Sequence, residues 1–330
     1  MSLLYIIVMM PISWSKGEDV FPTDNEFEQF ATSPSYRLLT APNRIPLEQV
    51  VSSYYGYAWH VKTFQDMNDY AAHPSAILSN GRDAVFIKMS EAPNGPDQFE
   101  VELTSLNYLS ERAGVLTPTP VGIVPVERGV ILVLEAVQAD ARTPQSWSEM
   151  GRTLARIHQV KGQRYGSETH GSFGPLYQDN RPLENWLDFY CERRLWPRLI
   201  GAIDSNNLPT SAIRMVEQFI VRLPHLDIPL NEPCLVHGDA HHNNFISARQ
   251  GTLVIDPAIY FGTPEIDLAY VDFFQPVPEE VFISYREILP IDPGLSKRRE
   301  LWRIHVYLAM IQVGALDYLR QLTDAVKLYL

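Results

Sequence analysis

Two short β-like runs, each followed at once by an aspartate, constrain the fold of this chain more than any other feature. The first run covers Pro233 to Val236 and precedes Asp239, and the second covers Thr252 to Ile255 and precedes Asp256. Helical patterns surround both runs. We therefore expect a β hairpin that delivers two carboxylates into a cleft between a small β-rich part of the chain and a larger helical part.

The β-rich part is expected over residues 36–136. Its β-like runs cover residues 75–78, 83–88 and 129–134. Asn80-Gly81 stands between the first two runs, and this dipeptide is a strong signal for a tight hairpin turn. Between the second and third runs, Gln98 to Arg112 carries apolar residues at helical spacing. The pattern predicts a small sheet that carries one helix.

After Ala136 the pattern changes from strand to helix, and residues 137–330 are expected to form the larger, mainly helical lobe. A first helix is expected after Pro144. Further amphipathic helices are expected at 183–199, 210–221, 264–274 and from 296 to near the C-terminus. The predicted fold is therefore α+β with two lobes, preceded by an N-terminal extension over residues 1–35.

Composition excludes several classes of partner. The 330 residues include 27 Lys and Arg against 39 Asp and Glu, a formal net charge of −12. A basic surface is what nucleic acids and anionic membranes attract, so neither is expected as a partner. Cys191 and Cys234 are too few for a disulfide framework, which favours a reducing, cytoplasmic location. The apolar run Leu3 to Ile12 is too short to span a bilayer, and a secretory signal is kept as the alternative.

Asp239 and Asp256 fit the requirements of phosphoryl transfer as well as the predicted fold. Phosphoryl transfer from a nucleotide requires a cation on the phosphates, oxygen ligands for magnesium and a carboxylate that orients the acceptor hydroxyl. Asp239 and Asn244 have the spacing of a kinase catalytic loop, in which the amide five positions after the base binds metal. Asp256 follows at the end of the next β run, where a second metal-binding acid belongs.

The small lobe supplies the remaining cation. Lys88 ends a β-like run, and Glu102 on the following helix is placed to hold it by an ion pair. A single lysine at a strand end is usually solvated. The ordered set Lys88, Glu102, Asp239, Asn244 and Asp256 is much more specific, because order, spacing and context agree.

These motifs resemble those of a known superfamily. The His-Gly-Asp-x-x-x-x-Asn loop at 237–244 and Ile-Asp-Pro at 255–257 look like those of aminoglycoside phosphotransferases and choline kinases, which share the protein-kinase fold. Residues 255–269, 171–178 and 186–195 more narrowly resemble the fructosamine kinase family. The resemblance runs from about residue 85 to residue 285, and that family phosphorylates the sugar of ketoamines with ATP and Mg²⁺.

The resemblance implies a role for each matching residue. Asp239 becomes the catalytic base, Asn244 and Asp256 the magnesium ligands, Lys88 the phosphate-binding lysine and Glu102 its partner. His237 and Asp267 are expected to brace the catalytic loop. Leu134 to Val137 corresponds to the adenine-binding hinge, so backbone groups of Glu135 and Val137 are expected to meet the base.

The acceptor is less defined. A small-molecule amine, and above all a sugar-derived amine, is the expected substrate, while aminoglycoside-type and choline-type acceptors stay open. The helix with Asp188, Glu192 and Arg193 lines the acceptor side in the resembling family, so these residues are substrate candidates. His241 is a further candidate, because it resembles a histidine of the aminoglycoside phosphotransferase loop. The sequence leaves the oligomeric state open.

Two rival interpretations remain. Residues 67–79 contain no glycine where a phosphate-cradling loop is expected, which would fit a pseudokinase or a binding module without turnover. The alternative is a zinc site formed by His237, His241 and His242 with Asp239. The segment does not have a helical pattern, and its spacing matches no zinc-hydrolase motif.

Overall fold

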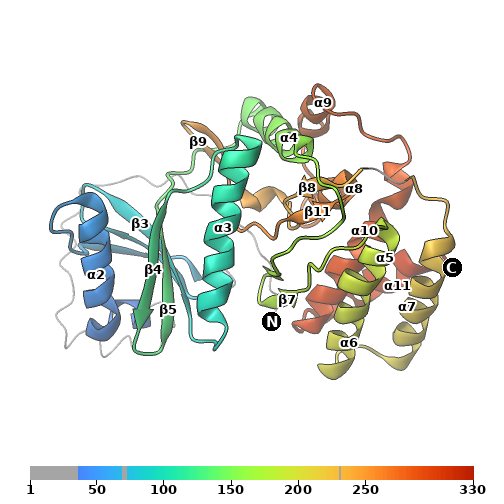
Figure 1. The fold of residues 1–330 in the computed structure, drawn as a ribbon, viewed down its shortest axis with the longest axis horizontal. Helices are drawn as coiled ribbons and strands as arrows, with labels where there is room; N and C mark the ends of the chain where they lie inside the picture. The colour runs from blue at the N-terminus through green and yellow to red at the C-terminus, as the bar shows by residue number, and fades with distance from the viewer. Residues whose placement is uncertain (1–35, 69–72, 230–231) are drawn as a thin grey trace.

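A five-stranded antiparallel sheet organises the N-terminal part of the chain (Figure 1). The computed structural model describes residues 36–68, 73–229 and 232–330, so the predicted extension lies outside the described residues. The strand order is β1-β2-β3-β5-β4. The strands are β1 (Thr63–Asp66), β2 (Ser75–Ser79), β3 (Ala84–Ser90), β4 (Pro120–Val126) and β5 (Gly129–Glu135). The hairpin predicted at Asn80-Gly81 is confirmed, with Gly81 at φ 89°.

One helix covers each face of this sheet. Alternate residues of β5 point to opposite faces, so Ile131 and Val133 pack with α2 (Ala41–Tyr55) while Leu132 packs with α3 (Gly95–Ala113). Figure 1 shows α3 between the sheet and the helical lobe. The helix that will contribute to the site is therefore held by the apolar face of the sheet.

Helix α2 was not anticipated, because residues 36–137 were expected to be mostly β-like. The helix has Pro42 in its first turn and Pro46 in its interior, and proline is a poor predictor of helix. Its apolar face is narrow, since Leu47 and Val51 are its buried hydrophobic residues. Packing against the sheet stabilises it more than intrinsic propensity does.

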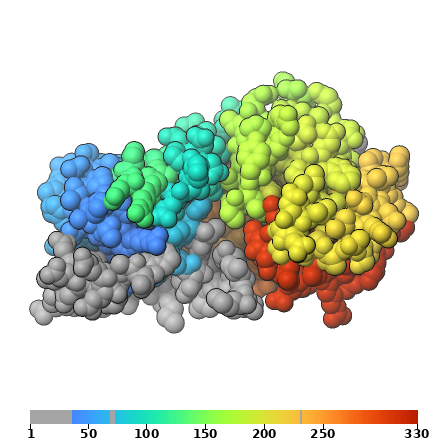
Figure 2. Space-filling view, turned by 90° about the horizontal axis from the view of Figure 1, so that it is seen from below, coloured from blue at the N-terminus to red at the C-terminus, as the bar shows by residue number. Residues whose placement is uncertain are grey.

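The C-terminal lobe is mainly helical. Its helices are α4 (Pro144–Gln159), α5 (Trp186–Phe189), a π-helical turn (Tyr190–Leu195), α6 (Trp196–Asp204), α7 (Thr210–Arg222), α8 (Pro264–Tyr270), α9 (Glu280–Arg286), α10 (Leu295–Gln312) and α11 (Leu319–Lys327). A short hairpin, β6 (Gly171–Phe173) and β7 (Leu176–Gln178), precedes α5. Figure 2 shows the two lobes at opposite ends of an elongated molecule.

Several predicted helix boundaries change. The helix predicted at 183–199 is the continuous run from α5 to α6, and the one predicted at 264–274 ends at Tyr270. The predicted C-terminal helix is two helices, because the chain turns at Gly314 with φ 95° before α11 begins. Glycine adopts this backbone conformation without steric cost.

The expected pairing of the two aspartate-bearing runs is wrong. Strand β8 (Cys234–Val236) pairs with β11 (Tyr260–Gly262), and β9 (Phe245–Ala248) pairs with β10 (Gly251–Val254). The reason is local, since Phe245–Ala248 lies one short turn before β10 and forms a tighter hairpin with it. The two aspartates therefore come from two small sheets that lie together.

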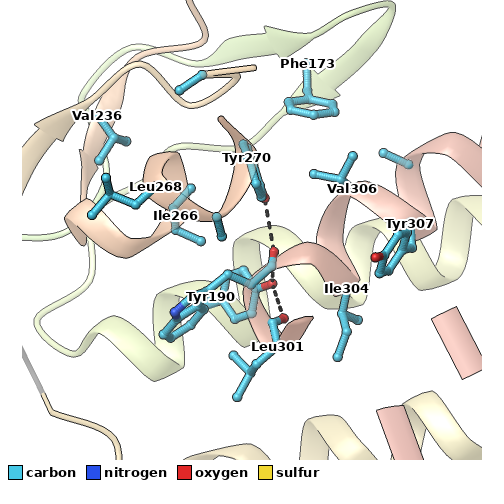
Figure 3. Packing of buried hydrophobic residues seen from close by; sticks show 14 of the residues in the cluster. Phe173, Tyr190, Val236, Ile266, Leu268, Tyr270, Leu301, Ile304, Val306 and Tyr307 are labelled. Atoms are coloured by element: carbon cyan, nitrogen blue, oxygen red, sulfur yellow. Dashed lines mark hydrogen bonds between the residues drawn. The ribbon is translucent and has the colours of Figure 1, made fainter. Parts of the chain in front are cut away.

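Aromatic residues dominate the core of the large lobe (Figure 3). The hydroxyl of Tyr190 donates hydrogen bonds to the carbonyl oxygens of Leu301 and Trp302, at 3.1 and 3.0 Å, and the hydroxyl of Tyr270 donates to Trp302 at 3.3 Å. Buried hydroxyls thus satisfy carbonyls of α10 inside an apolar cluster. The contacts fix α10 against α8 and the π-helical turn.

Both cysteines are buried free thiols. Burial raises the pKa of Cys191 and of Cys234, so the reactive thiolate is suppressed at neutral pH. A packing role fits both. Within the described ranges, no helix is long and apolar enough to cross a membrane.

The close approach of α4 and α9 gives a stability prediction. A Cβ at Gly151 would lie 2.1 Å from the carbonyl oxygen of Val281, a backbone atom that cannot rotate away. We expect Gly151→Ala to lower the free energy of unfolding by about 1–3 kcal/mol, the range for an overpacked core. Urea denaturation measures it.

Gly201→Ala is the matched control, because both glycines lie inside helices and gain the same helix propensity. There the added Cβ meets the end of the Gln312 side chain, which can move. Equal losses of stability in the two variants would contradict the backbone clash.

Candidate active site

The ordered set predicted from the sequence meets in one cavity. Lys88, Glu102, Asp239, Asn244 and Asp256 all contribute to its lining. Strand β3 supplies the lysine, α3 the glutamate, and the loops after β8 and β10 the rest. The cavity therefore lies where the two lobes meet.

Lys88 is buried and points toward α3. It lies opposite Leu132 in the ladder between β3 and β5, and Leu132 packs on the α3 face of the sheet. Its Nζ donates a 2.8 Å hydrogen bond to Oε1 of Glu102. Its Nζ also contacts Oδ1 of Asp256. Burial disfavours the charged lysine, but the carboxylates of Asp256 and Glu102 outweigh it and raise the pKa of Lys88.

Asp256 reaches this lysine from a strained backbone. Its φ is 51°, in the left-handed region that few residues other than glycine adopt and that aspartate tolerates better than most. Burial favours the neutral carboxyl, yet the charge of Lys88 prevails and lowers the pKa of Asp256. The group is thus an anion, the form in which a carboxyl group binds a hard cation.

Asp239 has a different environment. It follows Gly238, whose φ is 80° and whose added Cβ would lie 2.3 Å from the carbonyl oxygen of Ala258. Burial raises the pKa of Asp239 to about 7. A carboxyl with a pKa near neutrality is suited to accept a proton from a hydroxyl. The raised pKa of Asp239 and the lowered pKa of Asp256 suit the two carboxyl groups to different roles.

Asp267, on α8, braces this loop. Its carboxylate accepts hydrogen bonds from the backbone N–H groups of His237, at 2.6 Å, and Gly238, at 3.0 Å. It also contacts Nε2 of His158 on α4 at 3.0 Å, and all these groups are buried. The structure therefore agrees with the bracing role expected for Asp267.

His237 is a second brace. Its Nε2 lies 3.0 Å from the carbonyl oxygen of Ile255, and its Nδ1 accepts a 3.2 Å hydrogen bond from the backbone N–H of Asp239. Burial lowers the pKa of His237, which keeps the ring neutral. The ring thus links the loop that carries Asp239 to the segment that carries Asp256.

Asn244 suits a hard cation. Its Nδ2 donates a 2.8 Å hydrogen bond to the carbonyl oxygen of Asp239, which leaves its Oδ1 for a ligand. With a carboxylate oxygen of Asp256, this oxygen forms the sparse donor set that Mg²⁺ uses when phosphates and water complete its shell. The residues present therefore fit the ion.

The zinc interpretation finds no support. Within the part of the chain that the structure describes, no group of three or more His, Cys, Asp or Glu is arranged to hold a metal ion. The three histidines face different partners. His237 contacts Ile255, the ring of His241 packs edge-on against Phe274 at 5.0 Å, and His242 faces Trp147.

Only one of the four residues predicted to contact the acceptor lines the cavity. His241 lines the cavity, with Nε2 3.8 Å from Oδ2 of Asp239. Asp188, Glu192 and Arg193 do not line it. Asp188 and Glu192 are exposed, and Arg193 contacts Glu192 at 3.1 Å. The structure brings only His241 to the catalytic groups.

The hinge candidates lie at the junction of the lobes. Glu135 ends β5, and its side chain accepts a 3.1 Å hydrogen bond from the hydroxyl of Tyr54. Val137 follows in the segment that leads to α4. Neither residue lines the cavity described here, so adenine contacts at both positions stay a prediction.

Arg142 is a positioning residue that the sequence analysis missed. Its guanidinium donates to the carbonyl oxygens of His242, at 2.7 Å, and of Phe245, and stacks over Trp147 at 4.2 Å. It therefore holds the end of the catalytic loop from the inter-lobe segment. An isolated arginine near a helix start carries no sequence signal for this role.

A contact between the lobes closes one side of the cavity. Nε2 of Gln98, on α3, donates a 3.3 Å hydrogen bond to the carbonyl oxygen of Gly174 at the tip of the β6–β7 hairpin. It also lies 3.1 Å from Nε2 of His73. Helix α3 thus touches the hairpin one turn before Glu102.

Comparison with known proteins agrees with this geometry. The sequence profile of fructosamine kinases matches residues 46–330. The chain belongs to the fructosamine kinase family. The resemblance seen in the motifs is confirmed, and it extends on both sides of the segment in which they lie.

Two relatives match about four fifths or more of this fructosamine kinase family member. It is 28% identical over 265 residues to a probable ketoamine kinase of Pasteurella multocida, covering 79% of this chain and 90% of the relative. The crystal structure of a putative fructosamine-3-kinase from Thermobifida fusca is 27% identical with a TM-score of 0.74, covering 86% and 98% of the two chains.

A wider comparison confirms the kinase-like α+β fold. An aminoglycoside phosphotransferase, a thermostable mutant in complex with ADP and hygromycin B, is 14% identical with a TM-score of 0.58. The match covers 86% of this chain and 98% of the other. At this identity the likeness concerns the fold alone.

The brace on the catalytic loop gives the next prediction. Asp267→Asn replaces an acceptor by a group that presents N–H donors to the N–H groups of His237 and Gly238. We expect the free energy of unfolding to fall by about 1–3 kcal/mol, the cost of an unsatisfied buried polar group. Turnover is expected to fall while nucleotide affinity is retained, which calorimetric titration with ADP measures.

Asp227→Asn is the control, since Asp227 is exposed and lies outside the cavity. A variant at Asp267 that kept both the stability and the turnover of the control would refute the bracing role.

Proposed function

We propose that this protein transfers the γ-phosphoryl group of ATP to a hydroxyl of a ketoamine, a sugar-derived amine. The observation that carries the proposal is the convergence of Lys88, Glu102, Asp239, Asn244 and Asp256 in one cavity. These are the groups that phosphoryl transfer requires, and membership of the fructosamine kinase family supports the acceptor class.

Each group has a role in the proposed reaction. Asp239 orients the acceptor hydroxyl and takes its proton. The acceptor oxygen forms a bond to the γ-phosphorus while the bond from that phosphorus to the bridging oxygen of ADP breaks. Lys88, held by Glu102, binds the α- and β-phosphates. Magnesium bound by Asn244 and Asp256 would supply positive charge against the β- and γ-phosphate oxygens.

The lobes divide these tasks. Residues 36–136 are proposed to hold the nucleotide, with backbone groups near Glu135 and Val137 at the adenine. Residues 137–330 supply the base, the metal ligands and the acceptor site, where His241 is the candidate contact nearest to Asp239. The glycine-free segment between β1 and β2 favours the pseudokinase alternative, which a turnover assay resolves.

The direct test is release of ADP from Mg-ATP. Four acceptors are compared. Two are the ketoamines that lysine forms with glucose and with ribose, and the other two are kanamycin and choline. We expect turnover on a ketoamine, and Asp239→Ala should reduce it by about 10²–10⁴-fold, the contribution of a general base. Binding of ADP should stay nearly unchanged.

Turnover on kanamycin or choline, without turnover on a ketoamine, would show that the acceptor class is not the ketoamines. No turnover on any acceptor, together with normal binding of ADP, would favour the alternative of a pseudokinase or binding module. Full activity of Asp239→Ala would remove the assigned base.

Metal dependence is a separate prediction. Chelation with EDTA should abolish turnover, and Asp256→Asn should raise the Mg²⁺ concentration for half-maximal rate by about tenfold or more. An amide replaces an anionic ligand there, and Mg²⁺ prefers carboxylate oxygen. A Mg²⁺ titration of each protein measures it, with Asp227→Asn as control. An unchanged Mg²⁺ requirement in Asp256→Asn would contradict the ligand assignment.

A further inference from the structure

One helix face gives the cavity an apolar wall. Val306, Ala309 and Met310 of α10 line the cavity together with Val313, the C-cap residue of this helix. They stand at the i, i+3, i+4 and i+7 positions of a single face. Their spacing makes the wall continuous along two turns of helix. The catalytic cavity therefore extends beyond the phosphate-binding groups onto hydrocarbon.

Other elements complete this wall. Phe173 and Leu176 of the β6–β7 hairpin line the cavity, and so does Phe274 after α8. Figure 3 shows Phe173 on the side of α10 that carries Val306. We call these three residues, with the four of α10, the apolar wall. It is built from rigid elements, since α10 is fixed in the aromatic core.

Few charges face this cavity. Among its lining residues, all within the described ranges, the carboxylates are Glu102, Asp239 and Asp256, and each has a task in phosphoryl transfer. A second ammonium on the acceptor would thus find no carboxylate left over. Placing such a charge against hydrocarbon carries a desolvation cost without a compensating partner.

Acidic residues near α10 are already engaged. Glu265 accepts hydrogen bonds from Arg298 and from Nε1 of Trp302. Asp272 forms ion pairs with Arg299 at 2.8 Å and with Arg303 at 2.6 Å. These acids are neutralised by the protein itself, so they do not offset the missing charge in the cavity.

We propose that the apolar wall binds the substituent on the ketoamine nitrogen, and that the enzyme prefers an uncharged aliphatic chain there. This inference rests on the proposed function, because it places the sugar hydroxyl at Asp239. The nitrogen substituent then extends along α10, where each buried methylene adds affinity. Polycationic acceptors are disfavoured by the same surface.

A homologous series tests the proposal. The substrates are the fructose ketoamines of methylamine, butylamine and hexylamine, with that of 1,6-diaminohexane as the counterpart of the last that carries an added terminal ammonium. We expect kcat/KM to rise about fourfold for each added methylene, as burial of one CH₂ group predicts. The diaminohexane derivative should be at least about tenfold poorer than the hexylamine derivative.

The outcomes separate the two proposals. A flat series, or a preference for the diaminohexane derivative, overturns the apolar wall as the specificity element and leaves the ketoamine kinase intact. Absence of turnover on every ketoamine, including the methylamine derivative, overturns the proposed function itself.

A variant locates the effect. Val313 ends α10 and is 41% exposed, so Val313→Asp adds a carboxylate to the wall where the fold tolerates it. We expect the preference for hexylamine over diaminohexane to shrink by about tenfold, through KM rather than kcat. Val221→Asp, on α7 at 67% exposure and outside the cavity, should keep the wild-type ratio. An unchanged ratio in Val313→Asp would overturn the placement, and unfolding curves verify that both variants fold.

Discussion

The relation between the lobes depends on one buried cation. Lys88 belongs to the sheet, Glu102 to α3 and Asp256 to the C-terminal lobe, so the ammonium joins three elements of the structure. A buried charge is stable only when its partners are close. The sheet, the helix and the loop after β10 therefore share a single geometric condition. In the proposed reaction the same ammonium binds phosphate, so fold and chemistry would impose the same requirement.

A second condition acts within the large lobe. The carboxylate of Asp267 holds two consecutive N–H groups of the catalytic loop, while Arg142 holds two carbonyl oxygens at the far end of that loop. Hydrogen bonds thus hold both ends of a loop whose regular structure is one short 3₁₀ turn, His242–Asn244. This fixes the position of Asp239 before any substrate arrives.

The sequence predicted those features whose signals are local. The turn at Asn80-Gly81, the amphipathic pattern of α3 and the spacing from Asp239 to Asn244 each lie within a few residues, and all appear as expected. Features that depend on distant partners were missed. Helix α2 requires the sheet beneath it to become favourable. The partner of β8 follows Asp256 in the chain, and local pattern gives no means to choose it over β10.

Arg142 and the apolar wall belong to the same class of missed feature. An arginine that binds backbone carbonyls has no sequence-specific partner, and the residues of the wall from α10 look like ordinary core positions until the cavity beside them is known. Burial and function are indistinguishable in a hydrophobic pattern.

The contact of Gln98 with Gly174 has a thermodynamic consequence. Helix α3 carries Gln98 and, one turn later, Glu102, so the hairpin beside the acceptor and the lysine beside the phosphates are attached to one rigid rod. A ligand that displaces the hairpin tip shifts the anion that orients Lys88. Linkage then requires reciprocity: the factor by which an acceptor changes the affinity for nucleotide equals the factor by which nucleotide changes the affinity for acceptor. Synergistic binding of two substrates can arise from this rod alone, without any rotation of the lobes.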